Sequence, residues 1–144
     1  MAKPDFTGTW KLNRGRSSLQ IPAPDSTTFV IEHREPRFRL SRTHVAGGNS
    51  DTFAIELTTD GEQVVCNHGG LEIQARLRWE GETLVFDSEL VREGTRATNV
   101  VRYRLAEAGQ VFVAEESLRS EQHSHENTWV FDRSDLGAGP NQRL

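Results

Sequence analysis

The chain is divided into short segments in which apolar and polar residues alternate, with a turn signal between almost every pair. The segments are rich in Val, Ile, Leu, Phe and Thr, and none has a convincing helical period. Dipeptides such as Asp60-Gly61 and Glu80-Gly81 separate the segments and are typical of β-hairpins. Short strands linked by tight turns indicate an up-and-down barrel or a sandwich. The expected strands cover residues 6–13, 26–34, 37–45, 51–58, 62–68, 71–79, 83–92, 96–105, 110–118 and 124–132.

Two stretches depart from this pattern. Residues 13–26 contain Pro22 and Pro24, so this stretch is too long for a hairpin and too rich in proline for a strand. We expect one helical turn around residues 16–19 and then a crossing over the mouth of a barrel. The last residues include Gly-Ala-Gly-Pro and predict a flexible tail over 134–144. At 144 residues, the chain predicts a single β-barrel domain over residues 1–133.

The first expected strand places a glycine two residues before a tryptophan. Phe6, Gly8, Trp10 and Leu12 share one face of a pleated strand, and a glycine on that face leaves room for the large indole. Further motifs accompany it: Ser17-Ser18, Leu57-Thr-Thr-Asp-Gly61, Asn67-His-Gly-Gly70, Trp79-Glu-Gly-Glu-Thr-Leu-Val85 and Trp129-Val-Phe-Asp-Arg133.

On these motifs the chain resembles a family of small bacterial lipocalin-like proteins of the calycin superfamily, which also holds lipocalins and fatty-acid-binding proteins. The resemblance implies an antiparallel barrel whose closed end is plugged by the tryptophan of the first strand. It implies no activity, because the family has no established function. Together with the segment pattern, it predicts an all-β, antiparallel up-and-down barrel of about ten strands.

The composition limits the classes of partner and compartment. The net charge is −4, with 21 acidic and 17 basic residues, so the clustered positive excess that nucleic-acid binding needs is not present. No apolar run is long enough to cross a bilayer, and the first residues lack the apolar segment of a signal peptide. We therefore expect a soluble protein, cytoplasmic as written or exported if a leader was removed. The single cysteine, Cys66, excludes an intrachain disulfide and a cysteine-based metal cluster.

Four of the five histidines are expected at the open end of the barrel. Successive strands run in opposite directions, so every turn can be assigned to one end, and pleating directs His44, His68, His123 and His125 inward. Three imidazoles and a water would form an open site of catalytic zinc type, or one for another divalent transition metal, which predicts a metal-dependent hydrolase. A histidine-ligated haem is a variant of this hypothesis. Alternatively, the histidines are half-exposed rim residues hydrogen-bonded to water, and the sequence alone leaves open whether the chain is an enzyme.

The other hypothesis is a binding protein for a small, largely hydrophobic molecule, acting as a monomer or homodimer. A barrel of this strand count usually leaves an internal cavity, which apolar residues near its middle would line. Arg42 lies on the same face as Leu40, and its guanidinium either holds a ligand carboxylate or lies in solvent near the mouth. The expected ligand-binding residues are Phe38, Leu40, Arg42, Phe53, Ile55, Ile73, Leu77, Trp79, Phe86, Tyr103 and Trp129.

Overall fold

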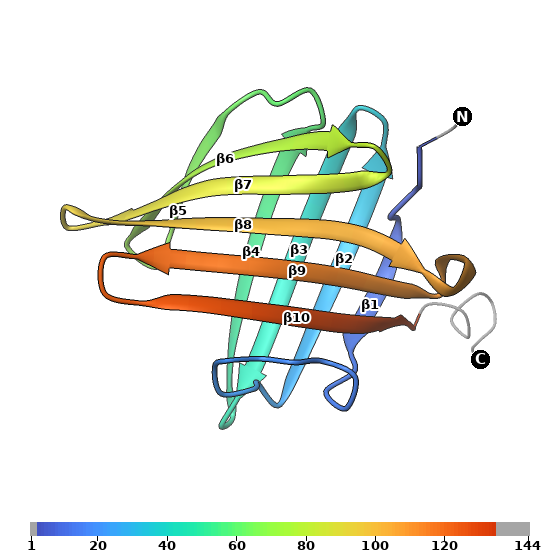
Figure 1. Cartoon of the computed structure of the whole chain (residues 1–144), viewed down its shortest axis with the longest axis horizontal. Helices are drawn as coiled ribbons and strands as arrows, with labels where there is room; N and C mark the ends of the chain where they lie inside the picture. Colours follow the sequence, from blue (N-terminus) through green and yellow to red (C-terminus); the bar gives the residue numbers. More distant parts are fainter. Residues whose placement is uncertain (1–2, 135–144) are drawn as a thin grey trace.

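The computed structural model describes residues 3–134, which form ten antiparallel strands in an up-and-down, nearly closed barrel (Figure 1). The predicted fold class is therefore confirmed. The order of hydrogen-bonded strands is β4-β3-β2-β1-β10-β9-β8-β7-β6-β5, so the ladder is continuous except between β4 and β5. The strands are β1 (Gly8–Leu12), β2 (Ser26–Arg34), β3 (Arg37–Ala46), β4 (Asn49–Thr58), β5 (Val64–His68), β6 (Leu71–Glu80), β7 (Thr83–Arg92), β8 (Thr95–Ala106), β9 (Val111–Ser120) and β10 (Ser124–Arg133).

The barrel is flattened into two layers. In Figure 1, β6 to β10 run across the front of the molecule and β2 to β4 cross steeply behind them. Inward-facing side chains of both layers form one core, because alternate residues of every strand point between the layers. A short 3₁₀ helix, Glu107–Gly109, joins β8 to β9. Among residues 3–134 no helix is long and apolar enough to cross a membrane.

The predicted tryptophan plug closes one end of the barrel. Trp10 is fully buried, and its indole Nε1 donates a hydrogen bond to the carbonyl oxygen of Phe6 at 3.0 Å. The guanidinium of Arg133 lies 4.2 Å from the centre of the Trp10 ring, where a cation is attracted to the aromatic face. Gly8 has a φ of +153°, which side chains other than glycine rarely adopt, so the backbone also requires a glycine there.

A polar network holds the chain that precedes β1 at this closed end. The backbone N–H of Phe6 donates to Nδ1 of the buried His33 at 3.2 Å. The Nε2 atom of His33 therefore carries the proton and donates to Glu35 at 2.9 Å. Glu35 also accepts hydrogen bonds from the hydroxyl of Thr59 and the indole of Trp79, each at 3.0 Å. Trp79 thus belongs to the closed end.

The segment between β1 and β2 forms a turn at residues 14–16, and no helix is present where a helical turn was predicted. The segment instead extends the edge of β10, because Ser18 and Thr128 exchange two backbone hydrogen bonds of 2.8 Å. Leu19 and Ile21 then pack against the core. At the other terminus, Ser134 donates its backbone N–H to the carbonyl of Thr9, and the rest of the predicted flexible tail lies outside the described residues.

Candidate ligand-binding site

A cavity of about 200 Å³ lies between the two layers. Most of its wall is apolar, and a group of polar side chains projects into it from β3, β5, β7, β8 and β9. The apolar and aromatic lining consists of Phe29, Leu40, Phe53, Leu71, Ile73, Phe86, Leu90, Val101, Tyr103, Ala114 and Trp129. The polar lining consists of Arg42, His44, His68, Ser88, Asn99 and Glu116.

Seven of the eleven predicted ligand-binding residues line this cavity: Leu40, Arg42, Phe53, Ile73, Phe86, Tyr103 and Trp129. The other four do not. Phe38 and Leu77 are fully buried and Ile55 is buried in the same core, while Trp79 is bonded to Glu35 at the closed end. Alternation along the strands correctly predicts that Phe38, Ile55 and Leu77 point inward. It does not tell how far along the barrel axis the empty space extends.

Glu116, on β9, organises one wall of the cavity. Its carboxylate accepts hydrogen bonds from the amide groups of Asn99 and Asn127, each at 3.0 Å, and from the indole of Trp129 at 2.9 Å. A carboxylate only accepts, so the Nδ2 side of Asn99 must face Glu116 and its Oδ1 is turned away. That buried oxygen has no hydrogen-bond partner among the described residues, which costs about 1–3 kcal/mol.

Arg42 reaches the cavity from β3, in the opposite layer. Its guanidinium lies 3.3 Å from a carboxylate oxygen of Asp51 and 5.5 Å from the centre of the Phe53 ring. Burial lowers the pKa of Arg42, and the field of Asp51 opposes that effect; an arginine nevertheless stays protonated in a protein. The Nε atom is buried and has no hydrogen-bond partner within residues 3–134. A guanidinium donor is thus left unpaired in the wall.

Two histidines complete the polar wall. Burial, and secondarily the charge of Arg42, lowers the pKa of His44 to about 4, so its imidazole is neutral at neutral pH. Its Nδ1 lies 2.6 Å from the hydroxyl of Thr27. His68, on β5, places its Nε2 3.0 Å from Asp51 on β4, which joins the two strands that share no ladder. The contact between His68 and Asp51 therefore bridges the break in the sheet beside the cavity.

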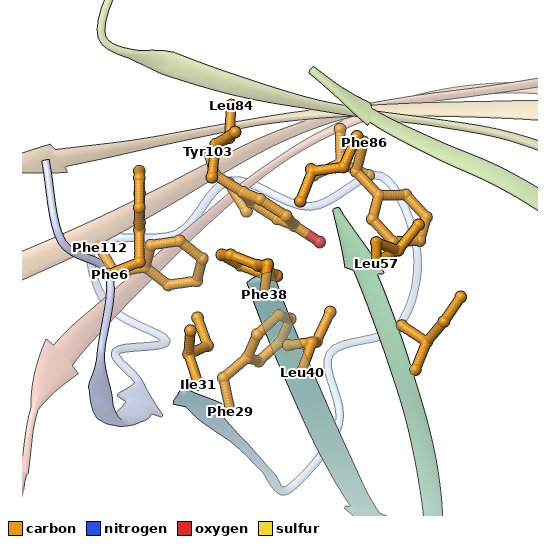
Figure 2. Packing of buried hydrophobic residues seen from close by; sticks show 14 of the residues in the cluster. Phe6, Phe29, Ile31, Phe38, Leu40, Leu57, Leu84, Phe86, Tyr103 and Phe112 are labelled. Atoms are coloured by element: carbon orange, nitrogen blue, oxygen red, sulfur yellow. The ribbon is translucent and has the colours of Figure 1, made fainter. Parts of the chain in front are cut away.

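Tyr103 places a hydroxyl among buried aromatic rings. Its ring centre lies 5.3 Å from that of Phe112 and 6.2 Å from that of Phe86. Figure 2 shows its hydroxyl pointing into the middle of the cluster, beside Phe38 and away from β8. No hydrogen bond joins this hydroxyl to any residue in the range 3–134, and burial raises its pKa, so it keeps its proton.

The structure does not bring the four predicted metal ligands together. His44 and His68 line the cavity, each bonded to a neighbouring side chain. His123 lies in the turn before β10, its ring stacks on that of His125 at 6.2 Å, and neither lines the cavity. Within residues 3–134, no three His, Cys, Asp or Glu side chains are placed to hold a metal ion. The hypothesis of a metal-dependent hydrolase therefore gains no support.

Sequence reasoning missed Glu116, Asn99 and Ser88. The signal was present in the sequence. Glu116 lies on the same strand face as the buried Phe112 and Ala114, and Asn99 lies on the same face as Val101 and Tyr103. Expecting only apolar lining and histidines leaves these polar residues out. A carboxylate two or four residues from a buried apolar residue, on the same strand face, is the pattern that predicts this polar wall.

No protein-family model matches the chain, and no curated protein matches it. Solved structures match over nearly its whole length. A secretory abundant heat soluble (SAHS) protein from Ramazzottius varieornatus has a TM-score of 0.69 and 14% identity, covering 93% of this chain and 98% of that one. Human cRBP IV has a TM-score of 0.58 and 16% identity, covering 91% and 99%. A zebrafish ileal bile acid-binding protein complexed with cholic acid has a TM-score of 0.58 and 13% identity, covering 90% and 98%. At these identities the likeness shows the fold alone, and the chain is therefore similar to these barrels in having a calycin-like fold.

Proposed function

We propose that the chain binds a small, largely hydrophobic molecule in the cavity between the two layers. The observation that carries this proposal is a space of about 200 Å³ inside the barrel, with walls that are mostly apolar. An apolar cavity of about 150 Å³ admits benzene, so this one has room for about eight to ten non-hydrogen atoms. Burial of apolar ligand surface supplies the main driving force, and the polar wall fixes the orientation of the ligand.

Comparison with other calycin-like barrels supports the proposal and also suggests that the ligand of this chain is smaller. The zebrafish bile acid-binding protein was solved with cholic acid, which has four fused rings. A ligand of that size does not fit in about 200 Å³, which lies below the usual range for drug-sized ligands. We therefore infer a smaller ligand for this chain. The proposal includes a single binding domain over residues 1–133 and membership in the bacterial lipocalin-like family that the motifs resemble.

Filling the cavity from within tests the proposal. Ala114 is buried and lines the cavity on β9, so Ala114→Phe places a ring in the ligand space. Ala54→Phe adds the same ring on the exposed face of β4 and serves as the matched control. Octanol, with nine non-hydrogen atoms at about 0.5 kcal/mol each, should bind the parent with a Kd of about 0.5 mM.

The readout is tryptophan fluorescence, because Trp129 lies in the cavity wall. We expect saturable titration with octanol for the parent and for Ala54→Phe, and at least about tenfold weaker binding for Ala114→Phe. Circular dichroism should show the same strand content in all three proteins. Equal octanol affinity in the parent and Ala114→Phe, or no saturable binding by the parent, would refute the proposed function.

A further inference from the structure

The positive charge in the cavity wall is already matched by negative charge. Arg42 is paired with Asp51 at 3.3 Å, and the carboxylate of Glu116 lines the same cavity. His44 is neutral at neutral pH and so adds no positive charge. A ligand carboxylate would lie in a space bounded by one guanidinium and one carboxylate, with a second carboxylate already bound to the guanidinium. Arg42 therefore does not act as the free counter-ion that an anionic ligand needs.

The unpaired hydrogen-bonding groups of the wall include both an acceptor and donors. Glu116 fixes the amide of Asn99 so that its Oδ1 is an acceptor without a partner among the described residues. The Nε–H of Arg42 and the hydroxyl of Tyr103 are donors to which no residue in the range 3–134 offers an acceptor. Arg42 on β3 and Asn99 on β8 belong to opposite layers, with β2, β1, β10 and β9 between them in strand order. A ligand between the layers thus meets unpaired groups of both kinds.

We propose that the cavity selects a ligand whose polar end is uncharged and carries both a hydrogen-bond donor and an acceptor, with a primary or secondary amide as the best match. This inference rests on the proposed function, since it names the chemical class of molecule that the same cavity takes. An amide N–H satisfies Asn99 Oδ1, and an amide oxygen accepts from Arg42 or Tyr103. A carboxylate or an ester offers no donor to Asn99, and an ammonium group offers no acceptor to Arg42.

Four probes of nine or ten non-hydrogen atoms separate these possibilities: octanamide, methyl heptanoate, octanoate and octylamine. At neutral pH they carry, respectively, a donor with an acceptor, an acceptor alone, an anion and a cation. We expect octanamide to bind about tenfold more tightly than methyl heptanoate, because the ester leaves the Asn99 oxygen unpaired. Octanoate and octylamine should bind more weakly than octanamide by at least about the same factor. Tryptophan fluorescence gives the four Kd values on one protein.

Two variants test the role of the Asn99 oxygen. Asn99→Leu removes the acceptor, so the affinities for octanamide and methyl heptanoate should become equal within about twofold. The matched control is Thr98→Leu, which adds the same side chain on the exposed face of β8 and should keep the ratio of the parent. Glu116→Gln is close in shape and can donate to Asn99 Oδ1, so the Asn99 amide can turn its nitrogen toward the ligand. That variant should bind octanoate better, relative to octanamide, than the parent does.

The outcomes separate this inference from the function on which it rests. Octanoate binding to the parent as tightly as octanamide would overturn the inference and identify Arg42 as the counter-ion of an anionic ligand. Equal binding of all four probes would also overturn it, while the proposed function would stand with an unselective apolar cavity. Saturable binding of none of the four would overturn both. An octanamide preference that Asn99→Leu leaves intact would show that the selecting group is not the Asn99 oxygen.

Discussion

Acidification should destabilise the barrel through His44. Burial lowers the pKa of this imidazole from 6.5 to about 4 in the folded chain, while the unfolded chain keeps the ordinary value. Between these values the unfolded state binds more protons than the folded state. Stability is therefore lost as the pH falls from 6.5 to about 4, and it is fully present above 6.5. Above that range His44 is neutral in both states and contributes no pH dependence.

The structure sets the size of this effect. A shift from 6.5 to about 4 corresponds to about 3 kcal/mol at 1.36 kcal/mol per pKa unit. The imidazole is only partly buried, and solvent screens the charges near it, so the expected loss is about 1–2 kcal/mol. The charged groups that face it are Arg42, Asp51 and Glu116, and the two carboxylates reduce the cost of protonation.

Urea unfolding at neutral pH and at about pH 4 measures the loss in the parent and in two variants. His44→Gln removes the titrating group and keeps a polar side chain beside Thr27, so it should lose about 1–2 kcal/mol less than the parent on acidification. His125→Gln makes the same substitution outside the cavity lining and should behave like the parent. Carboxylates such as Asp51, whose pKa is also lowered, are shared by all three proteins and cancel in the comparison. An equal loss in the parent and His44→Gln would refute the reasoning.

Two further substitutions test the closed end and the break in the sheet. Phe112→Ala removes a fully buried ring that packs 5.5 Å from Trp10, and should lower the free energy of unfolding by about 3–5 kcal/mol in urea titrations. A loss below about 1 kcal/mol would show that the closed end is not a packed core. Asp51→Asn weakens the pairing with His68 across the break between β4 and β5, and its exposure limits the effect on unfolding to less than about 1 kcal/mol. Amide hydrogen exchange in β5 should nevertheless become faster, and unchanged exchange would contradict the role of this contact in joining the strands.

The strands could be predicted because each carries local information. Alternation at a period of two and the turn signals place all ten within two residues of their observed bounds. The resemblance assigned Trp10 to the closed end, and because successive strands alternate in direction, that assignment fixes the end at which every turn lies. The direction of Leu40, Tyr103 and Trp129 into the barrel followed from the same pleat.

The site was only partly predictable, because it depends on distances between strands that are far apart in the sequence. Alternation could not show that Trp79 is drawn to Glu35 at the closed end. It also could not show that His125 lies outside the cavity lining. Side chains that point inward from the ends of different strands need not lie close to one another. The unpaired Asn99 oxygen depends on the carboxylate of Glu116 on a neighbouring strand. Such a feature requires the register of β8 and β9.

The most direct test of a ligand site inside the barrel is a map of amide chemical shifts with and without octanamide. We expect the largest changes at residues that line the cavity from different strands, such as Arg42, Tyr103, Ala114 and Trp129. Residues at the closed end, such as Trp10, should change little because their side chains are already fully packed. Changes confined to the outer faces of the strands, or no changes at saturating octanamide, would contradict binding in the cavity.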